Sequence, residues 1–425
     1  MRHRLEVRLP EENVADRRGK LPPALKHFCI LFAAMTLLSE LWSAVGSLVF
    51  HQRPPYGGTF SWYDAGQDLL IFRPRFLAFH TPHFWDAGGY PFTYPAPLGV
   101  VYWLLYKLPH VVELYLVFSI AALLLWAWFF ARRFADPGST FALMLLFLAA
   151  SWPVRFLLQT GNMETVVALT LGVGVLAALK GRWWLGAALI GIAGSMKLYP
   201  LALLGLVLAQ RRYREFAWGV AVASIATLTS LAFLGPGIFE AQRHIIDGLA
   251  FLQRRYVLAP LPNGLQFSHS LFNLVKLGVF VVAKLESLST TRTEALMATA
   301  LNIYVPLIAL AAIVLYLRIR QMPRLNQVIA LTVCAVLLPP FSLDYTLVEL
   351  LVPFGLLCVF TVAAWREREQ PAGLALCFTC FALLFTTGAY FQLKYRFAAQ
   401  VRTLALMALL AAVLHYRFER EGEPA

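Results

Sequence analysis

Long apolar runs make up most of this chain, and short polar or basic segments separate them. Most runs are long enough for a helix to cross the roughly 30 Å hydrocarbon core of a bilayer. They cover roughly residues 28–50, 111–131, 139–157, 161–180, 183–196, 198–210, 216–234, 298–317, 326–341, 345–363, 371–390 and 397–416. The pattern predicts an all-α polytopic membrane protein with about 12 transmembrane segments.

The composition indicates the same class. Hydrophobic residues make up 59% of the 425 residues and charged residues only 14%, which is far too apolar for one soluble domain. The net charge of +13 does not indicate a nucleic-acid partner, because much of it lies at the ends of apolar runs. The CFTC sequence at 377–380 falls within such a run, so we interpret it as packing rather than metal or redox chemistry.

Basic clusters predict the orientation. Residues 1–27 are polar and basic and precede an apolar run too long for a signal-peptide core, which predicts a cytoplasmic N-terminus without a cleavable signal. Six further clusters are then cytoplasmic: Arg132/Arg133, Lys180/Arg182, Arg211/Arg212/Arg214, Arg318/Arg320, Arg366/Arg368 and Arg417/Arg420. All six clusters can lie on the cytoplasmic side only if residues 93–108 lie in the outer interface and do not cross the membrane. Residues 28–416 then form one transmembrane domain, followed by a cytoplasmic C-terminus, 417–425.

Two long segments, roughly 51–110 and 235–297, remain on the outer side. They are neither rich in charge nor poor in aromatic residues, so we expect folded loops with juxtamembrane helices in the outer leaflet. The sequence GGTFSWYDAGQDLL at 57–70 has helical spacing, with Ser61, Asp64 and Asp68 on one face. No convincing internal repeat is present, and an inverted repeat would have favoured a transporter.

Two of the runs, 183–196 and 198–210, are too short to cross. They lie between two cytoplasmic basic clusters, and each would form only about 20 Å of helix. We predict a broken hairpin whose tip, with Lys197 and Pro200, stops in the outer half of the membrane. A buried lysine needs an anionic partner, which is either a carboxylate of the protein or an anionic ligand from the outer leaflet.

Other polar residues are predicted at the same depth or in the outer loops, and they form the candidate site. They are Asn162 and Glu164 in QTGNMET (159–165), Ser342, Asp344, Tyr345 and the deeper Glu349 in PPFSLDYTLVE (339–349), Tyr199 beside Lys197, and the loop residues Asp64, Asp68, Asp86, Tyr94, Arg254 and Arg255. Carboxylates suit general-base catalysis, and the cations suit phosphate. Together they indicate a phosphate-linked substrate that undergoes displacement. His80 and His83 have no carboxylate partner at suitable spacing, so we expect a structural role for them.

Several passages resemble glycosyltransferase family 87, whose members have the GT-C fold and include polyprenyl-phosphate-mannose-dependent mannosyltransferases of bacterial membranes. WYDAGQDLL resembles the family's first-loop helix, and YPFTYPAPLG its PFTYPP signature. The most specific match is the stretch from QTGNMET to SMKLYPLALL (159–204), which resembles the GQxN…K(L)xP core. PPFSLDYTLVELLVPF resembles the SPxSxxY element, and SHSLFNL (268–274) resembles a downstream serine motif.

The resemblance implies a substrate and a mechanism. A polyprenyl-phosphate hexose, with mannose expected first, binds from the outer leaflet while Lys197 and arginines hold its phosphate. A first-loop aspartate acts as general base, and an acceptor hydroxyl displaces polyprenyl phosphate in one inverting step. Neither a metal nor another cofactor is needed if these cations neutralise the phosphate. The site would face the periplasm or exterior of a bacterial inner membrane, and the acceptor is a lipid, a glycan or a protein.

The chain departs from the family pattern at three places. Thr59 and Phe60 stand near the position of the family's first-loop aspartate, so the nearest carboxylate, Asp64, is our first candidate for the base, followed by Asp86 and Asp68. The glutamine of GQxN is replaced, and Tyr345 stands where many members have histidine. These departures leave the donor sugar and the acceptor open.

Two other classes of protein fit parts of the pattern. A secondary transporter or flippase of a lipid-linked or anionic substrate would also use intramembrane Glu and Lys residues and a broken hairpin. In a non-catalytic assembly factor, the charged residues on the outer side would have no role in catalysis. We favour the enzyme because the polar residues gather on one side of the membrane rather than at its midplane.

Overall fold

The computed structural model describes residues 21–51, 66–79, 81, 83–87, 90–259, 265, 268–367, 371–386 and 398–419. The described part is helical and contains no strand, apart from an isolated bridge between Ser268 and Leu343. The elements are α2 (Pro23–Leu48), α3 (Gln67–Leu70), α4 (Arg73–Leu77), α5 (Ala96–Tyr106), α6 (Val111–Ala131), α7 (Pro137–Ala150), α8 (Trp152–Thr160), α9 (Glu164–Leu179), α10 (Trp183–Met196), η1 (Tyr199–Leu203), α11 (Leu204–Ala209), α12 (Tyr213–Leu234), α13 (Ile238–Leu252), η2 (Gln253–Leu258), α14 (Leu271–Leu285), α15 (Thr290–Ile319), α16 (Arg324–Leu337), η3 (Asp344–Leu350), α17 (Leu351–Arg366), α18 (Leu374–Phe385) and α19 (Ala398–His415). The predicted all-α class is confirmed.

Five helices of the described part are long and apolar enough to cross a membrane: α2, α6, α12, α15 and the continuous pair η3–α17. A sixth candidate is the pair α7–α8, which is bent by 62°. Pro153 in the first turn of α8 suits a new helix start there, so the run predicted over 139–157 is divided in two. The protein is therefore a multi-pass membrane protein. The other apolar helices of the described part are shorter, with 10–17 residues, and the count of about 12 spans stays a prediction.

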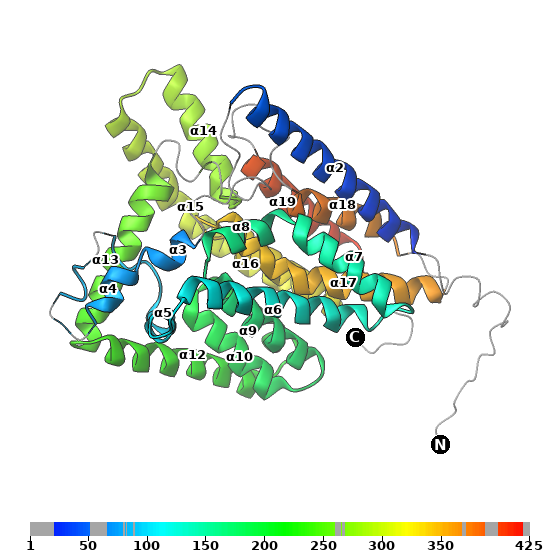
Figure 1. Ribbon diagram of the computed structural model, residues 1–425, viewed down its shortest axis with the longest axis horizontal. Coiled ribbons are helices and arrows are strands. Elements are labelled where there is room, and N and C mark those ends of the chain that lie inside the picture. Colours follow the sequence, from blue (N-terminus) through cyan, green and yellow to red (C-terminus); the bar gives the residue numbers. More distant parts are fainter. Residues whose placement is uncertain are drawn as a thin grey trace.

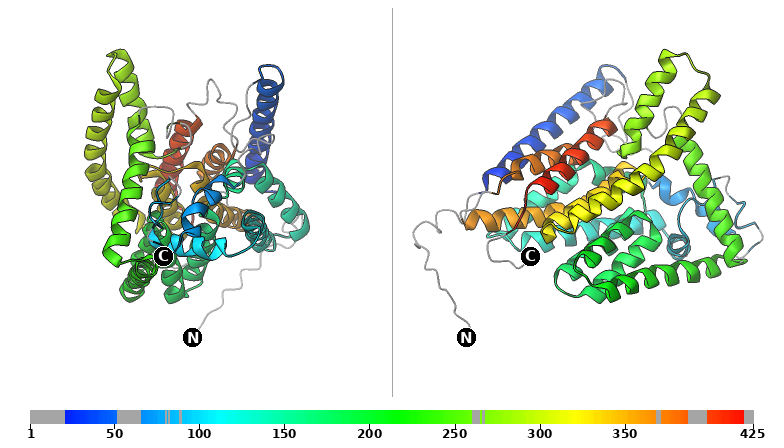
Figure 2. Two further views of the ribbon diagram at one scale, coloured as in Figure 1. Left: turned by 60° about the vertical axis from the view of Figure 1, so that its left-hand side comes forward. Right: turned by 180° about the vertical axis from the view of Figure 1, so that it is seen from behind.

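The two predicted sides of the membrane correspond to opposite ends of the molecule. Figure 1 shows α3, α4, α5, α13 and α14 at the left-hand end, whereas α6, α17 and the turn between α9 and α10 end at the right. The view from behind in Figure 2 shows the same division. The basic segments at the C-terminal ends of α6, α9 and α17 thus gather at one end of the molecule, as the positive-inside rule predicts for one side of a membrane.

The predicted broken hairpin is present. Helix α10 ends at Met196, Lys197 is extended with φ −144° and ψ 138°, and Pro200 lies in the 3₁₀ turn η1. Helix α10 packs against α9 and α12, with such a close approach that a Cβ at Gly191 would lie 2.3 Å from the carbonyl oxygen of Gly219. Small residues permit this contact between membrane helices, and it fixes the position of the tip that carries Lys197.

The outer segments contain short helices, as predicted. Helix α5 covers 11 residues of the stretch 93–108 and rises only about 16 Å, in keeping with an interfacial position. The helix predicted over 57–70 appears only as α3, because residues 57–65 lie outside the described part. Helix α13 packs tightly on the first outer segment, where a Cβ at Gly248 would lie 1.9 Å from the carbonyl oxygen of Phe92. Cys377 and Cys380 of CFTC are buried, unbridged residues of α18, as expected for packing.

Candidate active site

The side chain of Lys197 lies in a buried ion pair. Its ammonium group donates to the carboxylate of Glu164 and lies 3.2 Å from the side-chain oxygen of Asn162. Lys197 is only 8% exposed, and Asn162 and Glu164 are fully buried. Of the two partners that the sequence left open, the structure therefore contains the carboxylate of the protein.

Asp68 from the first outer segment joins this group. The amide of Asn162 donates to Oδ2 of Asp68 at 2.7 Å and to the hydroxyl of Tyr94 at 3.1 Å. Burial raises the pKa of the Asp68 carboxyl, while the hydrogen bond from Asn162 and the charge of Lys197 oppose this rise. The raised pKa makes Asp68 a more basic carboxylate than usual. Because the side chain is only half-buried, it still has access to a substrate.

Tyrosines and a third carboxylate complete the arrangement. The hydroxyl of Tyr199 donates to Glu164 and lies 3.3 Å from Oε1 of Glu349. The ammonium group of Lys197 lies 4.8 Å from the ring centroid of Tyr345 and 5.4 Å from that of Tyr94. We call this set the Lys197 cluster: Asp68, Tyr94, Asn162, Glu164, Lys197, Tyr199, Tyr345 and Glu349. It contains one cation and three carboxyl groups.

Two glycines bring Asp68 to Asn162. Gly66 precedes α3 with φ +76°, and Gly161 follows α8 with φ +65°. A Cβ on Gly161 would lie 2.9 Å from Cα of Gly66, and the N–H of Gly66 donates to the carbonyl oxygen of Gln159 at 2.8 Å. Glycine adopts this left-handed backbone without steric cost and leaves room for the contact. The first outer segment is therefore held against the outer end of α8.

Replacing Gly161 with alanine is expected to slow the enzyme as well as destabilise it. The left-handed backbone costs about 1–2 kcal/mol for a residue with a Cβ. The new Cβ would also push the backbone of Gly66 away from Gly161. A shift of the base of about 1 Å can cost up to about 10²-fold in rate. Gly181→Ala is the matched control, because Gly181 has φ +76° but open space around its Cβ position. Turnover and thermal unfolding of both variants test this, and equal loss of turnover in both would contradict it.

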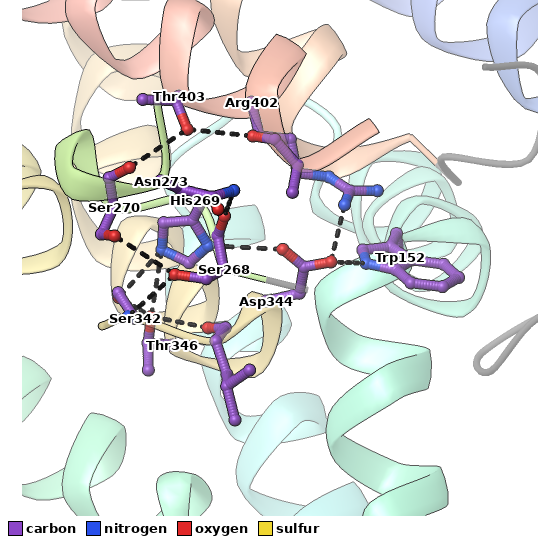
Figure 3. A network of polar contacts seen from close by, with 12 residues as sticks. Trp152, Ser268, His269, Ser270, Asn273, Ser342, Asp344, Thr346, Arg402 and Thr403 are labelled. Atoms are coloured by element: carbon purple, nitrogen blue, oxygen red, sulfur yellow. Dashed lines mark hydrogen bonds and ion pairs between the residues drawn. The ribbon is translucent and has the colours of Figure 1, made fainter. Parts of the chain in front are cut away.

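Asp344 and Ser342 lie in a second buried network (Figure 3). The carboxylate of Asp344 accepts from Arg402 at 2.6 Å and from the indole of Trp152 at 2.9 Å, and lies 3.3 Å from Nδ1 of His269. Nε2 of His269 lies 3.0 Å from the hydroxyl of Ser342. Burial lowers the pKa of His269, although Asp344 opposes this effect. The network connects α8, α19 and the 268–270 loop to η3, which supplies Tyr345 and Glu349 to the Lys197 cluster.

The remaining predicted residues lie elsewhere. Asp64 is outside the described residues. Asp86 is exposed, and its charge acts on the buried guanidinium of Arg75. Arg254 and Arg255 are exposed on η2, where the guanidinium of Arg255 lies 5.8 Å from the ring centroid of Tyr90. Tyr90 is close enough for the charges of both Asp68 and Arg255 to influence its hydroxyl, so Arg255 lies toward the Lys197 cluster.

The sequence reasoning did not identify Trp152, His269 and Arg402. Arg402 had a signal of the kind that singled out Lys197, because it is an isolated cation in the apolar run 397–416. No group of three or more His, Cys, Asp or Glu side chains suited to a metal occurs within the described residues.

The apolar helices and the buried Lys197 cluster define a multi-pass membrane protein with a polar site among its helices. Residues 92–338, more than half of the chain, match the model of glycosyltransferase family 87. The chain therefore belongs to glycosyltransferase family 87, as the sequence motifs predicted. This membership does not favour a transporter or flippase.

One curated relative is a polyprenol-phosphate-mannose-dependent alpha-(1-2)-phosphatidylinositol pentamannoside mannosyltransferase of Mycobacterium tuberculosis (strain CDC 1551 / Oshkosh). It is 29% identical to this chain over 163 residues, which are 37% of this chain and 36% of the relative. The match therefore spans about a third of the relative's own length.

Proposed function

We propose that the enzyme transfers a hexose, with mannose as the first candidate, from a polyprenyl-phosphate carrier to an acceptor hydroxyl at the outer face of a bacterial inner membrane. The observation that carries this proposal is the hydrogen bond that holds the half-buried Asp68 beside Asn162 and Lys197. Family membership and the donor named for the mycobacterial relative support it. A lipid-linked acceptor fits the same relative's name, and a glycan or a protein is the alternative acceptor.

The proposed step is a single inverting displacement. Asp68 removes the proton from the acceptor hydroxyl, whose oxygen attacks the anomeric carbon as the bond to the phosphate oxygen breaks. Polyprenyl phosphate leaves with both electrons of that bond, and the proton stays on Asp68 until it exchanges with water. The raised pKa of Asp68 suits a general base.

We propose that Arg254 and Arg255 bind the donor phosphate. Lys197 is balanced by Glu164 inside the protein, so it has little net charge to offer an anion. The two arginines are exposed, and no carboxylate of the described part forms an ion pair with them. Arginine is well suited to phosphate because its planar donors match two oxygens. These cations would neutralise the leaving phosphate, so the proposed reaction needs no metal.

Arg255→Gln is expected to raise KM for the donor by about 10- to 100-fold, because a hydrogen bond to a charged group contributes about 1.5–3 kcal/mol. Arg243→Gln on α13 is the control, because it removes the same charge from an exposed position on the same outer segment. Steady-state kinetics with varied donor test this. An unchanged KM in Arg255→Gln, or an equal rise in both variants, would contradict it.

The proposed function is tested with the purified enzyme in proteoliposomes that contain EDTA. Labelled polyprenyl-phosphate mannose, glucose and arabinose are supplied in turn, beside a nucleotide-linked mannose, with membrane extract as the acceptor. We expect transfer from a lipid-phosphate donor and none from the nucleotide donor. Transfer from the nucleotide sugar alone would overturn the proposal, and loss of transfer on adding EDTA would overturn its metal-independent form.

A further inference from the structure

A large apolar cleft lies outside the Lys197 cluster, between α6, α9 and the η3–α17 segment. Its volume is about 500 Å³. Aromatic side chains of α6, including Trp126 and Phe129, form one wall, and small residues of α9, including Ala168 and Gly172, form the floor. The catalytic proposal assigns no role to this space.

One mouth of the cleft is strongly basic. Arg132, Lys180 and Arg182 line it, and all three are exposed. The Arg132 guanidinium lies 5.1 Å and the Lys180 ammonium 5.7 Å from the ring centroid of Phe129. Within the described residues, no carboxylate forms an ion pair with these cations. The mouth therefore offers three uncompensated charges, two of them beside the ring of Phe129.

The other end of the cleft is apolar and reaches the region beneath the Lys197 cluster. Thr165 and Val348 line this end, and they are the neighbours of Glu164 and Glu349 in the chain. The rise of α9 from Thr165 to Lys180 is about 22 Å, which is most of the hydrocarbon thickness of roughly 30 Å. An occupant that fits has an anionic head at one end and a long apolar tail.

We propose that this cleft binds an anionic phospholipid from the leaflet that faces the basic helix ends. Its phosphate would lie among Arg132, Lys180 and Arg182, and one acyl chain would follow Ala168 and Gly172. Basic pockets between membrane helices on the cytoplasmic side recognise anionic lipid head groups in this way. The position of the three cations favours this lipid over the sugar donor, because we place the donor's phosphate at the opposite end of the molecule.

Native mass spectrometry of the purified protein, titrated with phosphatidylglycerol or phosphatidylcholine, tests the proposal. The triple variant Arg132→Gln/Lys180→Gln/Arg182→Gln is expected to bind phosphatidylglycerol about 100-fold more weakly, because each cation near the membrane surface adds to the attraction of an anionic head group. Arg211→Gln/Arg212→Gln/Arg214→Gln removes three charges from a neighbouring basic cluster and is expected to keep the binding. Unchanged binding in the first variant, or equal loss in both, would overturn the proposal.

Ala168→Phe fills the floor of the cleft without changing its charge. We expect it to release bound phosphatidylglycerol while the thermal unfolding midpoint and KM for the sugar donor stay close to those of the wild type. If phosphatidylglycerol stays bound and KM for the donor rises, the cleft belongs to the polyprenyl tail and the proposal fails. The phosphatidylglycerol readout is independent of whether the assigned donor sugar is correct.

Discussion

Asp68→Asn is expected to lower the rate of sugar transfer by about 10²- to 10⁴-fold, the usual contribution of a general base. Asparagine keeps the shape of the side chain and its contact with Asn162 but cannot accept the acceptor's proton. The measurement is kcat of the purified variant in proteoliposomes at saturating donor, with thermal unfolding recorded to confirm the fold.

Asp86→Asn is the matched control, because Asp86 is an exposed carboxylate of the same outer segment. We expect its kcat to stay within about threefold of wild type, as for a surface charge. Asp64→Asn completes the set, since the sequence ranked Asp64 first. Wild-type turnover in Asp68→Asn together with loss in Asp64→Asn would move the base to Asp64 and refute the role of Asp68.

The pH dependence of the enzyme gives an independent test of the same role. Asp68 must be deprotonated to act as a base, and burial raises its pKa. The acidic limb of kcat/KM is therefore expected above the usual range of a carboxyl group. Asn162→Ala removes the hydrogen bond that opposes this rise, so its acidic limb should move to still higher pH. A limb that stays in place or moves down would contradict the assignment.

Lys197→Met is expected to destabilise the protein by about 3–5 kcal/mol, because removing one partner of a buried ion pair leaves an uncompensated buried charge. Glu164 is fully buried and would lose the ammonium group beside it. The free energy of unfolding, measured in mixed micelles, gives the size of the effect.

The double variant Lys197→Met/Glu164→Gln separates this cause from a simple packing defect. With both charges removed, we expect it to recover most of the stability lost in Lys197→Met. If the losses of stability in Lys197→Met and in Glu164→Gln instead add up in the double variant, the ion pair contributes little. Transfer activity should stay low in the double variant, because Asn162 loses the contact with Lys197.

The sequence predicted the elements of this site better than their connections. The broken hairpin followed from two short apolar runs with Lys197 between them, since helix length and hydrophobic thickness are fixed quantities. Asn162, Glu164 and Tyr345 were predicted at the same depth as Lys197, because they lie at the outer ends of their apolar runs, and a buried lysine needs an anionic partner. The structure brings all three to Lys197.

The connections between distant segments could not be predicted. Asp68 and Asn162 are 94 residues apart, and their meeting depends on the contact between Gly66 and Gly161, which no local pattern reveals. The partners of Asp344 come from α8, α19 and the 268–270 loop. A single sequence indicates that such a carboxylate needs partners, but not which side chains supply them.

A single-turnover experiment tests most directly that this chain uses a lipid-phosphate donor at the Lys197 cluster. Enzyme in excess is mixed with limiting labelled polyprenyl-phosphate mannose and acceptor membranes in EDTA, beside Asp68→Asn. We predict that the wild type releases one polyprenyl phosphate for each sugar transferred, while the variant leaves the donor intact. An intact donor in both, with glucose and arabinose donors equally unchanged, would contradict the assigned reaction.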